Sequence, residues 1–326
     1  MQLTDSLGRS INYLRLSVTD RCNMRCFYCM PKEGVVSKGH DAVLSYEELL
    51  LIAETAVELG IEKIRITGGE PLVRKGIAGF LARLSAINGL RHLALTTNGL
   101  LLAEMAGELY NAGVQRLNVS LDSLDAGTFA RITRGGDLKT VLGGLDAAEQ
   151  AGFQPPKINV VIMRGVNDAE IPAFAEMTRE RGNSVRFIEY MPALKEEGWQ
   201  RYCISGEEIL RSLGEHYTLE QVDKGPFAGP SRDFRIPGAR GTIGIITAVS
   251  GHFCNECNRI RVTSTGQAKG CLFSDDKTDL VPWLRPPDRE GLAKVLRDIV
   301  SAKPERHGIS RDGYGHRNFT MSQIGG

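Results

Sequence analysis

Short runs of β-branched and apolar residues alternate with longer amphipathic stretches through the first two-thirds of the chain. This alternation is typical of repeated βα units whose strands form a parallel sheet. Between the first two runs, Ser45 and Glu48 have the spacing of a helix-capping box, and Gly60 stands where that helix should end. The pattern predicts six strands, at residues 13–18, 62–67, 92–97, 116–121, 158–163 and 185–190.

Six units are too few for a closed eight-stranded barrel, and no Gly-x-Gly-x-x-Gly follows the first predicted strand, as a dinucleotide-binding sheet would require. The sequence therefore predicts an α/β fold, an incomplete (βα)6 barrel of the TIM type, with its chemistry at the C-terminal ends of the strands. After a predicted helix at 206–213 the chain becomes rich in Gly and Pro. We expect the partial barrel to span residues 1–222 and a smaller C-terminal domain to span 223–326.

The composition gives no sign of a nucleic-acid or membrane partner. The chain carries 40 Lys and Arg against 39 Asp and Glu, so any anionic substrate must be met by a local group of cations. No apolar run approaches the roughly 18 residues of a membrane span. Seven cysteines, in two tight groups and one single, are more typical of metal ligands than of disulfides, and we expect a cytoplasmic protein.

The first cysteine group, Cys22, Cys26 and Cys29, has the spacing C-x3-C-x2-C directly after the first predicted strand. Three thiolates can hold three irons of a [4Fe-4S] cluster and leave the fourth iron open to chelate a small molecule such as S-adenosylmethionine (SAM). A zinc site would need a fourth ligand, and His40 is distant in sequence. The segment Gly68-Gly69-Glu70-Pro71 ends the second predicted strand, where the glycines would admit a ligand and Glu70 could accept from its ammonium.

The second group, Cys254, Cys257 and Cys271, has the spacing C-x2-C-x13-C and again offers three thiolates. We interpret it as a second [4Fe-4S] cluster with an open iron, although His252 keeps a cramped zinc site as an alternative. Arg259 and Arg261 would project to one side of an extended strand beside this group, and guanidinium forks suit phosphate oxygens. The alternative for the two arginines is a solvated pair of charges.

With both groups in view, the chain resembles the GTP 3′,8-cyclases of molybdenum cofactor biosynthesis, a family of radical SAM enzymes. The resemblance runs nearly end to end and includes DSLGR at 5–9, LRLSVTDR at 14–21, TTNG at 96–99, NVSLD at 118–122 and QIGG at 323–326. It implies a lyase in which the first cluster cleaves SAM to a 5′-deoxyadenosyl radical. The radical takes the ribose 3′ hydrogen of GTP, and C3′ attacks C8 to give 3′,8-cyclo-7,8-dihydro-GTP.

The resemblance also implies roles for individual residues. The second cluster would anchor the guanine of GTP, and Arg259, Arg261, Gly325 and Gly326 would serve catalysis. A reduced flavodoxin or ferredoxin-type protein would supply electrons, and the chain would form a homodimer. The SAM side would comprise Tyr28, Gly69, Ser120 and Met191. The GTP side would comprise Arg15, Arg65, Thr96, Lys157, Arg259, Ile260 and Arg261.

Two features depart from the family pattern. Thr265-Gly266 replaces its usual Asp-Gly pair, and Cys203 has no recognised counterpart. Two other functions compete with the cyclase. One is a radical SAM maturase of peptides or cofactors, although maturases usually carry more C-terminal cysteines. The other is a non-catalytic zinc module, for which a neutral chain with 6% aromatic residues offers no basic stacking surface.

The family resemblance generates a first prediction, for the C-terminus. In the cyclases a flexible Gly-Gly end enters the active site, where the lack of side chains permits a narrow approach. A tag appended after Gly326 is therefore expected to abolish GTP cyclisation, measured as product formed under anaerobic conditions, while the same tag placed at the N-terminus serves as control. Full turnover by the C-terminally tagged protein would contradict the prediction.

Overall fold

The computed structural model describes residues 3–35, 39–191, 198–223, 229–251 and 253–308. The strands are β1 (Tyr13–Ser17), β2 (Lys63–Thr67), β3 (His92–Thr97), β4 (Arg116–Ser120), β5 (Lys157–Ile162), β6 (Ser184–Glu189), β7 (Glu220–Val222), β8 (Arg232–Arg235), β9 (Ile243–Ile246), β10 (Arg259–Val262), β11 (Gln267–Lys269) and β12 (Thr278–Asp279). The helices are α1 (Tyr46–Glu58), α2 (Ile77–Ser85), α3 (Leu102–Asn111), α4 (Ala126–Thr133), α5 (Leu138–Gln150), α6 (Ile171–Glu180), α7 (Gly206–Gly214) and α8 (Arg289–Ser301).

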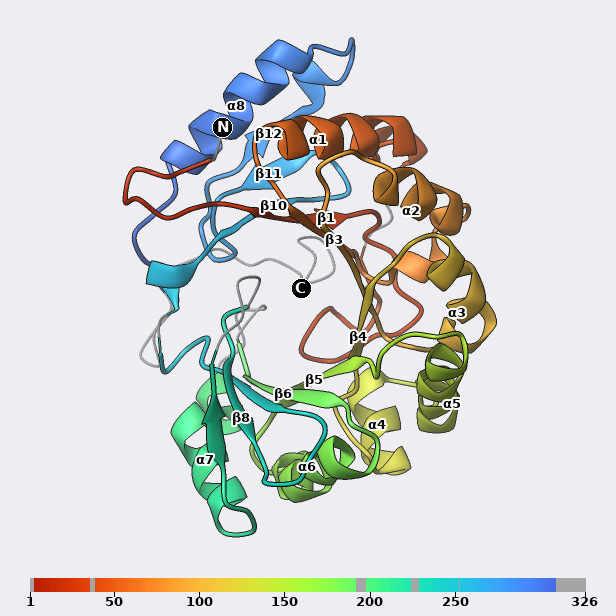
Figure 1. Ribbon diagram of the computed structural model, residues 1–326, viewed down its shortest axis with the longest axis vertical. Helices are drawn as coiled ribbons and strands as arrows, with labels where there is room; N and C mark the ends of the chain where they lie inside the picture. The colour runs from red at the N-terminus through yellow and green to blue at the C-terminus, as the bar shows by residue number, and fades with distance from the viewer. Residues whose placement is uncertain (1–2, 36–38, 192–197, 224–228, 252, 309–326) are drawn as a thin grey trace.

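Strands β1 to β6 lie side by side in chain order, each parallel to the next, and helices connect them. All six predicted strands are present, with every end within one residue of its prediction. The sheet curves, and its helices follow the outer, convex side (Figure 1). The incomplete (βα)6 barrel is therefore confirmed.

Two further parallel strands come from the C-terminal part of the chain, and the sequence did not predict this. Strand β10 pairs with β1, with Ile260 opposite Leu14, and β9 pairs with β6, with Ile245 opposite Phe187. Antiparallel strands then extend both edges to give the order β12-β11-β10-β1-β2-β3-β4-β5-β6-β9-β8-β7. The open edges of a half-barrel carry unpaired backbone groups, and these strands pair with them. The division at residues 222 and 223 stays a prediction.

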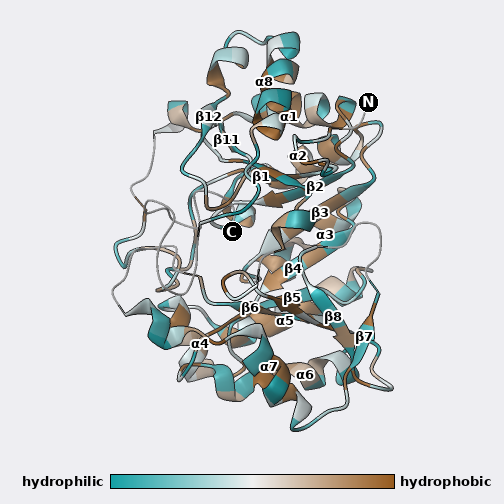
Figure 2. Ribbon diagram, turned by 90° about the vertical axis from the view of Figure 1, so that its left-hand side faces the viewer, coloured by the Kyte–Doolittle hydropathy of each residue, from teal (hydrophilic) through white to brown (hydrophobic). Residues whose placement is uncertain are grey.

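The helices bury one face against the sheet and expose the other, so that teal and brown residues alternate along them in Figure 2. Helix α1 begins as predicted: the Ser45 hydroxyl accepts from the Glu48 amide at 3.2 Å, and the Glu48 carboxylate accepts from the Ser45 amide at 2.6 Å. Gly60 follows its end with a φ of 103°. Among the described residues, no helix is long and apolar enough to cross a membrane.

The inner, concave face of the sheet is polar, and this determines where the site lies. In β2, Ile64 and Ile66 are buried in the core between sheet and helices. Lys63 and Arg65 alternate with them and are only partly buried. Because successive side chains of a strand point to opposite faces, both cations face the interior of the half-barrel.

Candidate functional site

A cavity of about 190 Å³ lies at the C-terminal ends of the parallel strands. All three cysteines of the first group line it, together with the four residues expected on the SAM side: Tyr28, Gly69, Ser120 and Met191. Ser120 ends β4, Gly69 follows β2, and Met191 follows β6. The structure therefore brings these residues together at the edge of the sheet where a TIM-type barrel gathers its chemistry.

The two glycines after β2 pack against the loop that carries the cysteines. The Gly69 amide donates to the Thr19 carbonyl at 2.8 Å. A Cβ atom at Gly68 would lie 2.6 Å from the Thr19 oxygen, and one at Gly69 would lie 2.4 Å from the Arg21 oxygen. Since real Cβ atoms essentially never approach so closely, any side chain here would push the cysteine loop away. The glycines thus position that loop, besides lining the cavity.

Glu70 has a structural role that its sequence position did not suggest. Its carboxylate is fully buried and accepts from the Leu72 amide at 3.0 Å, the Asn98 amide at 2.6 Å and the Thr97 hydroxyl at 2.9 Å. Burial raises the pKa of Glu70 to about 7 against the opposing effect of these donors. The carboxylate therefore joins the loops after β2 and β3, and its contact with a bound ammonium stays a prediction.

Tyr28 is held by an acidic residue that the sequence did not single out. Its hydroxyl donates to the Asp122 carboxylate at 2.7 Å, and the Val161 amide donates to the other oxygen of that carboxylate at 2.8 Å. Burial raises the pKa of Asp122 to about 6, while these two donors lower it. Asp122 also lines the cavity, so it both orients Tyr28 and offers polar atoms to a ligand.

The thiols of Cys22, Cys26 and Cys29 fit an iron-sulfur cluster by donor type and position. They form no disulfide, are partly buried and line one common cavity. Burial raises the pKa of Cys26, and the neighbouring Asp122, Cys29 and Cys22 raise it further, so the three thiolates need cations to offset this repulsion. Within the described part of the chain, no three His, Cys, Asp or Glu side chains are grouped to hold a single metal ion.

A second cavity, of about 130 Å³, adjoins the first, because Asn159, Ile188 and Met191 line both. Its described lining contains six cations and no carboxylate. The cations are Arg15, Lys63, Arg65, Arg186, Arg259 and Arg261. Such a surface, inside a chain of net charge +1, is suited to a polyanion.

Strand register puts these cations in rows. Arg261 on β10, Arg15 on β1 and Arg65 on β2 are directly opposite one another, and Tyr13 lies between Arg259 and Lys63 in the next row. Pairing of these strands therefore forces like charges together. Arg259 and Arg261 were predicted to project to one side of an extended strand. This prediction is confirmed, since both residues are in β10 and both line the cavity.

Burial and neighbouring charges shift the pKa values of the residues on this surface. Burial, with Arg65, Arg186 and Arg259 nearby, lowers the pKa of Lys63 to about 8. Burial likewise lowers the pKa of Arg261 to about 10, assisted by Arg259. Burial raises the pKa of Tyr13, but the surrounding cations outweigh it and lower the value to about 8. The Tyr13 hydroxyl is buried and has no hydrogen-bond partner among the described residues.

The second cysteine group lies beside the start of β10. Cys254 is in a 3₁₀ turn, Cys257 comes two residues before β10, and Cys271 comes two residues after β11. They form no disulfide, and burial raises the pKa of Cys254, assisted by the neighbouring Cys271 and Cys257. Burial raises the pKa of Cys257, but Arg259 and Lys303 outweigh it and lower the value to about 7. Three adjacent thiols with cations beside them fit a second cluster in the same way as the first group.

The two groups lie toward opposite ends of neighbouring parallel strands. Cys22 follows the C-terminal end of β1, whereas Cys257 precedes the N-terminal end of β10. A strand of five residues, such as β1, spans roughly 16 Å. The cationic rows lie between these two ends, so a ligand on them would have one cysteine group at each side.

Three residues expected on the GTP side lie outside the lining of the second cavity. Thr96 lines the first cavity, beside the cysteines. Lys157 lines neither, although Arg186 and Lys63 contribute with burial to lowering its pKa to about 7. Ile260 is buried in the core on the opposite face of β10. Gly325, Gly326 and His252 lie outside the described residues.

Several lining residues were missed from the sequence, chiefly Lys63, Arg186, Tyr13 and Asn159. One signal was available for the first two. A parallel strand covered by helices on both faces is expected to be apolar throughout. Charged residues at alternate positions of such a strand therefore indicate that one of its faces is a functional surface and not part of the core. Nothing local distinguishes Tyr13 or Asn159 from ordinary strand residues.

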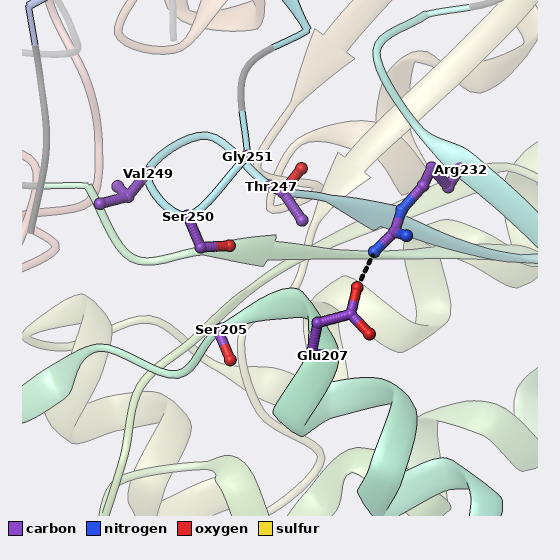
Figure 3. A pocket seen from close by; sticks show the side chains of 7 residues that line it. All are labelled: Ser205, Glu207, Arg232, Thr247, Val249, Ser250 and Gly251. Atoms are coloured by element: carbon purple, nitrogen blue, oxygen red, sulfur yellow. Dashed lines mark hydrogen bonds and ion pairs between the residues drawn. The ribbon is translucent and has the colours of Figure 1, made fainter.

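A third hollow, of about 640 Å³, lies at the start of α7 and holds none of the predicted residues (Figure 3). Its single charged pair, Arg232 and Glu207, is joined at 2.7 Å, and its other lining residues are neutral. The buried Glu189 carboxylate accepts from the amide of the lining residue Val249 and from the Gly206 amide. This hollow therefore lacks both the thiols that line the first cavity and the unopposed positive charge that lines the second.

Comparison with known proteins agrees with this geometry. Residues 16–178 match the model of the radical SAM superfamily, and residues 183–309 match that of Molybdenum Cofactor Synthesis C. The chain is 64% identical to a GTP 3′,8-cyclase of Geobacter sulfurreducens over the full length of both chains. It is 45% identical to a GTP 3′,8-cyclase of Peptoclostridium acidaminophilum, over 99% of this chain and 98% of that one.

Solved structures show the same fold at low sequence identity. Streptococcus suis SuiB bound to S-adenosylmethionine superposes with a TM-score of 0.61 at 13% identity, covering 88% of this chain and 67% of that one. Native anSMEcpe with bound AdoMet and a peptide superposes with a TM-score of 0.54 at 14% identity, covering 87% of this chain and 82% of that one. With identity this high to its full-length relatives, the chain belongs to the GTP 3′,8-cyclase family of radical SAM enzymes.

Proposed function

We propose that this protein is a lyase that converts GTP to 3′,8-cyclo-7,8-dihydro-GTP at an early step of molybdenum cofactor biosynthesis. The observation that carries the proposal is the pair of adjoining cavities, one lined by three cysteines and the other by six cations. Asn159, Ile188 and Met191 form their common boundary, so a radical generated in the first cavity needs to travel only to a neighbouring ligand. Full-length identity to curated cyclases supports the same conclusion.

SAM would occupy the first cavity. A [4Fe-4S] cluster on Cys22, Cys26 and Cys29 would supply the electron that cleaves SAM into methionine and the 5′-deoxyadenosyl radical. The chain's own contribution is positioning. Tyr28, fixed by Asp122, Ser120 at the end of β4, and the Gly69 backbone would hold the cofactor, while Met191 would contact it at the boundary with the second cavity.

GTP would occupy the second cavity. Its triphosphate would lie on Arg15, Lys63, Arg65 and Arg186, which replace the hydration of several phosphate oxygens. Charge complementarity supports this, because the anion relieves repulsion that strand pairing imposes on these cations. Thr96 and Lys157 retain a proposed supporting role toward GTP, and Ile260 would contribute its backbone, since its side chain lies in the core.

The guanine end of GTP would approach the second cysteine group. A second [4Fe-4S] cluster on Cys254, Cys257 and Cys271 would anchor it, with Arg259 and Arg261 contacting the reacting nucleotide from β10. Gly325 and Gly326 are proposed to complete the site. A reduced flavodoxin or ferredoxin-type donor, a homodimer and a cytoplasmic location complete the proposal.

The function is tested by mixing reconstituted protein, SAM, GTP and a strong reductant without oxygen. We expect 5′-deoxyadenosine and a cyclised guanosine triphosphate in equal amounts. Cys22→Ala should lose both products, because it removes a ligand of the first cluster. Deoxyadenosine formed without consumption of GTP would keep the radical SAM chemistry and contradict the substrate.

The two-cluster proposal predicts about eight irons per chain after anaerobic reconstitution, two cubanes' worth. Replacing Cys254, Cys257 and Cys271 with Ala should leave about four, and so should replacing the first group. Iron and sulfide analysis measures both, with Cys203→Ala as the control that keeps eight. A wild-type value of four, or zinc without sulfide, would contradict the second cluster.

Lys63 generates a prediction about pH. Its pKa of about 8 in the free protein means that it loses its proton as pH rises through 8, whereas a bound triphosphate favours the protonated form. GTP should therefore bind with proton uptake near pH 8 and more weakly at higher pH. Ionisation of Tyr13, also near pH 8, acts in the same sense, because a phenolate repels the triphosphate.

Calorimetric titration with GTP in two buffers of different ionisation enthalpy measures this uptake. Lys63→Met should reduce the uptake and weaken GTP binding about 10-fold to 100-fold, the range for one charge-assisted contact. The exposed Lys75→Met, which makes the same change outside the cavities, should alter neither quantity. Identical GTP affinity between pH 7 and pH 9 would count against the assignment.

A further inference from the structure

Lys303, two residues beyond the end of α8, is a buried lysine, 5% exposed, whose role the sequence did not indicate. Its Nζ atom lies 3.3 Å from the Cys257 thiol, 3.1 Å from the Arg259 carbonyl and 2.6 Å from the Gly270 carbonyl. An ammonium has three N–H donors and no acceptor, so these three acceptors use its full capacity. Lys303 thereby joins Cys257 to the residue that precedes Cys271.

The remaining cysteine of this group is held by a second buried cation from the opposite end of the chain. Arg9 donates to the Cys254 carbonyl at 2.9 Å and to the Pro304 carbonyl at 2.8 Å. Its side chain is 8% exposed, and Asp5, completely buried, holds its Nε atom at 2.5 Å. The DSLGR segment at 5–9 therefore contacts both Cys254 and the backbone next to Lys303.

We propose that Lys303 is a positioning residue of the second cluster, which it serves by donating a hydrogen bond to a ligand sulfur and by holding the segments of two cysteines together. The inference rests on the proposed second cluster. Lys303 and Arg9 between them contact all three cysteine segments, and both come from outside the 254–271 stretch. Residues from the N-terminal and C-terminal parts of the chain thus hold the three cysteine segments together.

Two consequences follow for a cluster bound there. Partners that orient metal ligands contribute about 10-fold to 100-fold in metal affinity. A hydrogen bond from a cation to a cluster sulfur also stabilises the reduced, more negative state, which raises the reduction potential. Both properties can be measured without turnover of GTP.

The test uses the full-length chain with Cys22, Cys26 and Cys29 replaced by Ala, so that the second cluster is observed alone. In this background, protein with Lys303 intact should hold about four irons. Lys303→Met keeps an unbranched side chain but removes the charge and the donors. We expect this variant to lose iron to a chelator at least about 10-fold faster than protein with Lys303 intact. Its midpoint potential, measured in a redox titration followed by electron paramagnetic resonance, should shift to more negative values.

Lys294→Met is the matched control, since Lys294 is exposed on α8, nine residues earlier, and should leave both quantities unchanged. Lys303→Gln, whose amide is too short to reach all three acceptors, should change both quantities in the same direction if Lys303→Met does not fold. Folding is judged on the apo protein by circular dichroism.

The inference is overturned if the Lys303 variants lose iron at the same rate as the control and have the same midpoint potential. Loss of folding of the apo protein in both variants would overturn it as well, because Lys303 would then serve the fold in general. An iron-free background protein with Lys303 intact would contradict the second cluster itself, which is a separate failure of the proposed function.

Discussion

Repulsion among cations on the inner face of the sheet is the constraint that the site depends on. Neighbouring strands are about 4.8 Å apart, so cations at directly opposite positions on one face of the sheet repel one another. Arg261, Arg15 and Arg65 occupy such adjacent positions without an acidic residue in the described lining of their cavity. The apolar residues of the same strands, buried under the helices, hold the sheet together against this repulsion. A polyanion is therefore the ligand that this face is arranged to accept.

The parallel sheet also separates the two cysteine groups by about one strand length. Because β10 pairs in parallel with β1, the residues before β10 and those after β1 necessarily lie at opposite ends of the sheet. Apolar residues next to both groups nevertheless belong to one small cluster, which includes Tyr28, Met191 and Leu272. The two cysteine groups are thus held apart by strand length, while apolar residues next to both pack in one cluster.

Buried polar contacts between distant segments fix the loops that carry the cysteines. Glu70 joins the loops after β2 and β3. Because Gly68 and Gly69 have no side chain, the backbone of the first cysteine loop can pack directly against them. Lys303 and Arg9 do the equivalent at the second group. Glu70, Lys303 and Arg9 are each withdrawn from water and make hydrogen bonds to backbone amides or carbonyls instead, which fixes the positions of the loops they contact. Such contacts explain how irregular loops can hold a defined ligand geometry.

The sequence by itself determined the six βα units, the capping box at Ser45 and the two cysteine groups, because periodicity, capping and ligand spacing are local properties. It did not determine that β9 and β10 would join the barrel sheet, nor that Lys63 and Arg186 would meet Arg259 in one cavity. The hydrogen bonds of Glu70 could not be predicted from the sequence either, since two of its partners lie 27 and 28 residues away and only folding brings them within reach. Strand register and burial decide which side chains share a space, and both are set by contacts between residues remote in the chain.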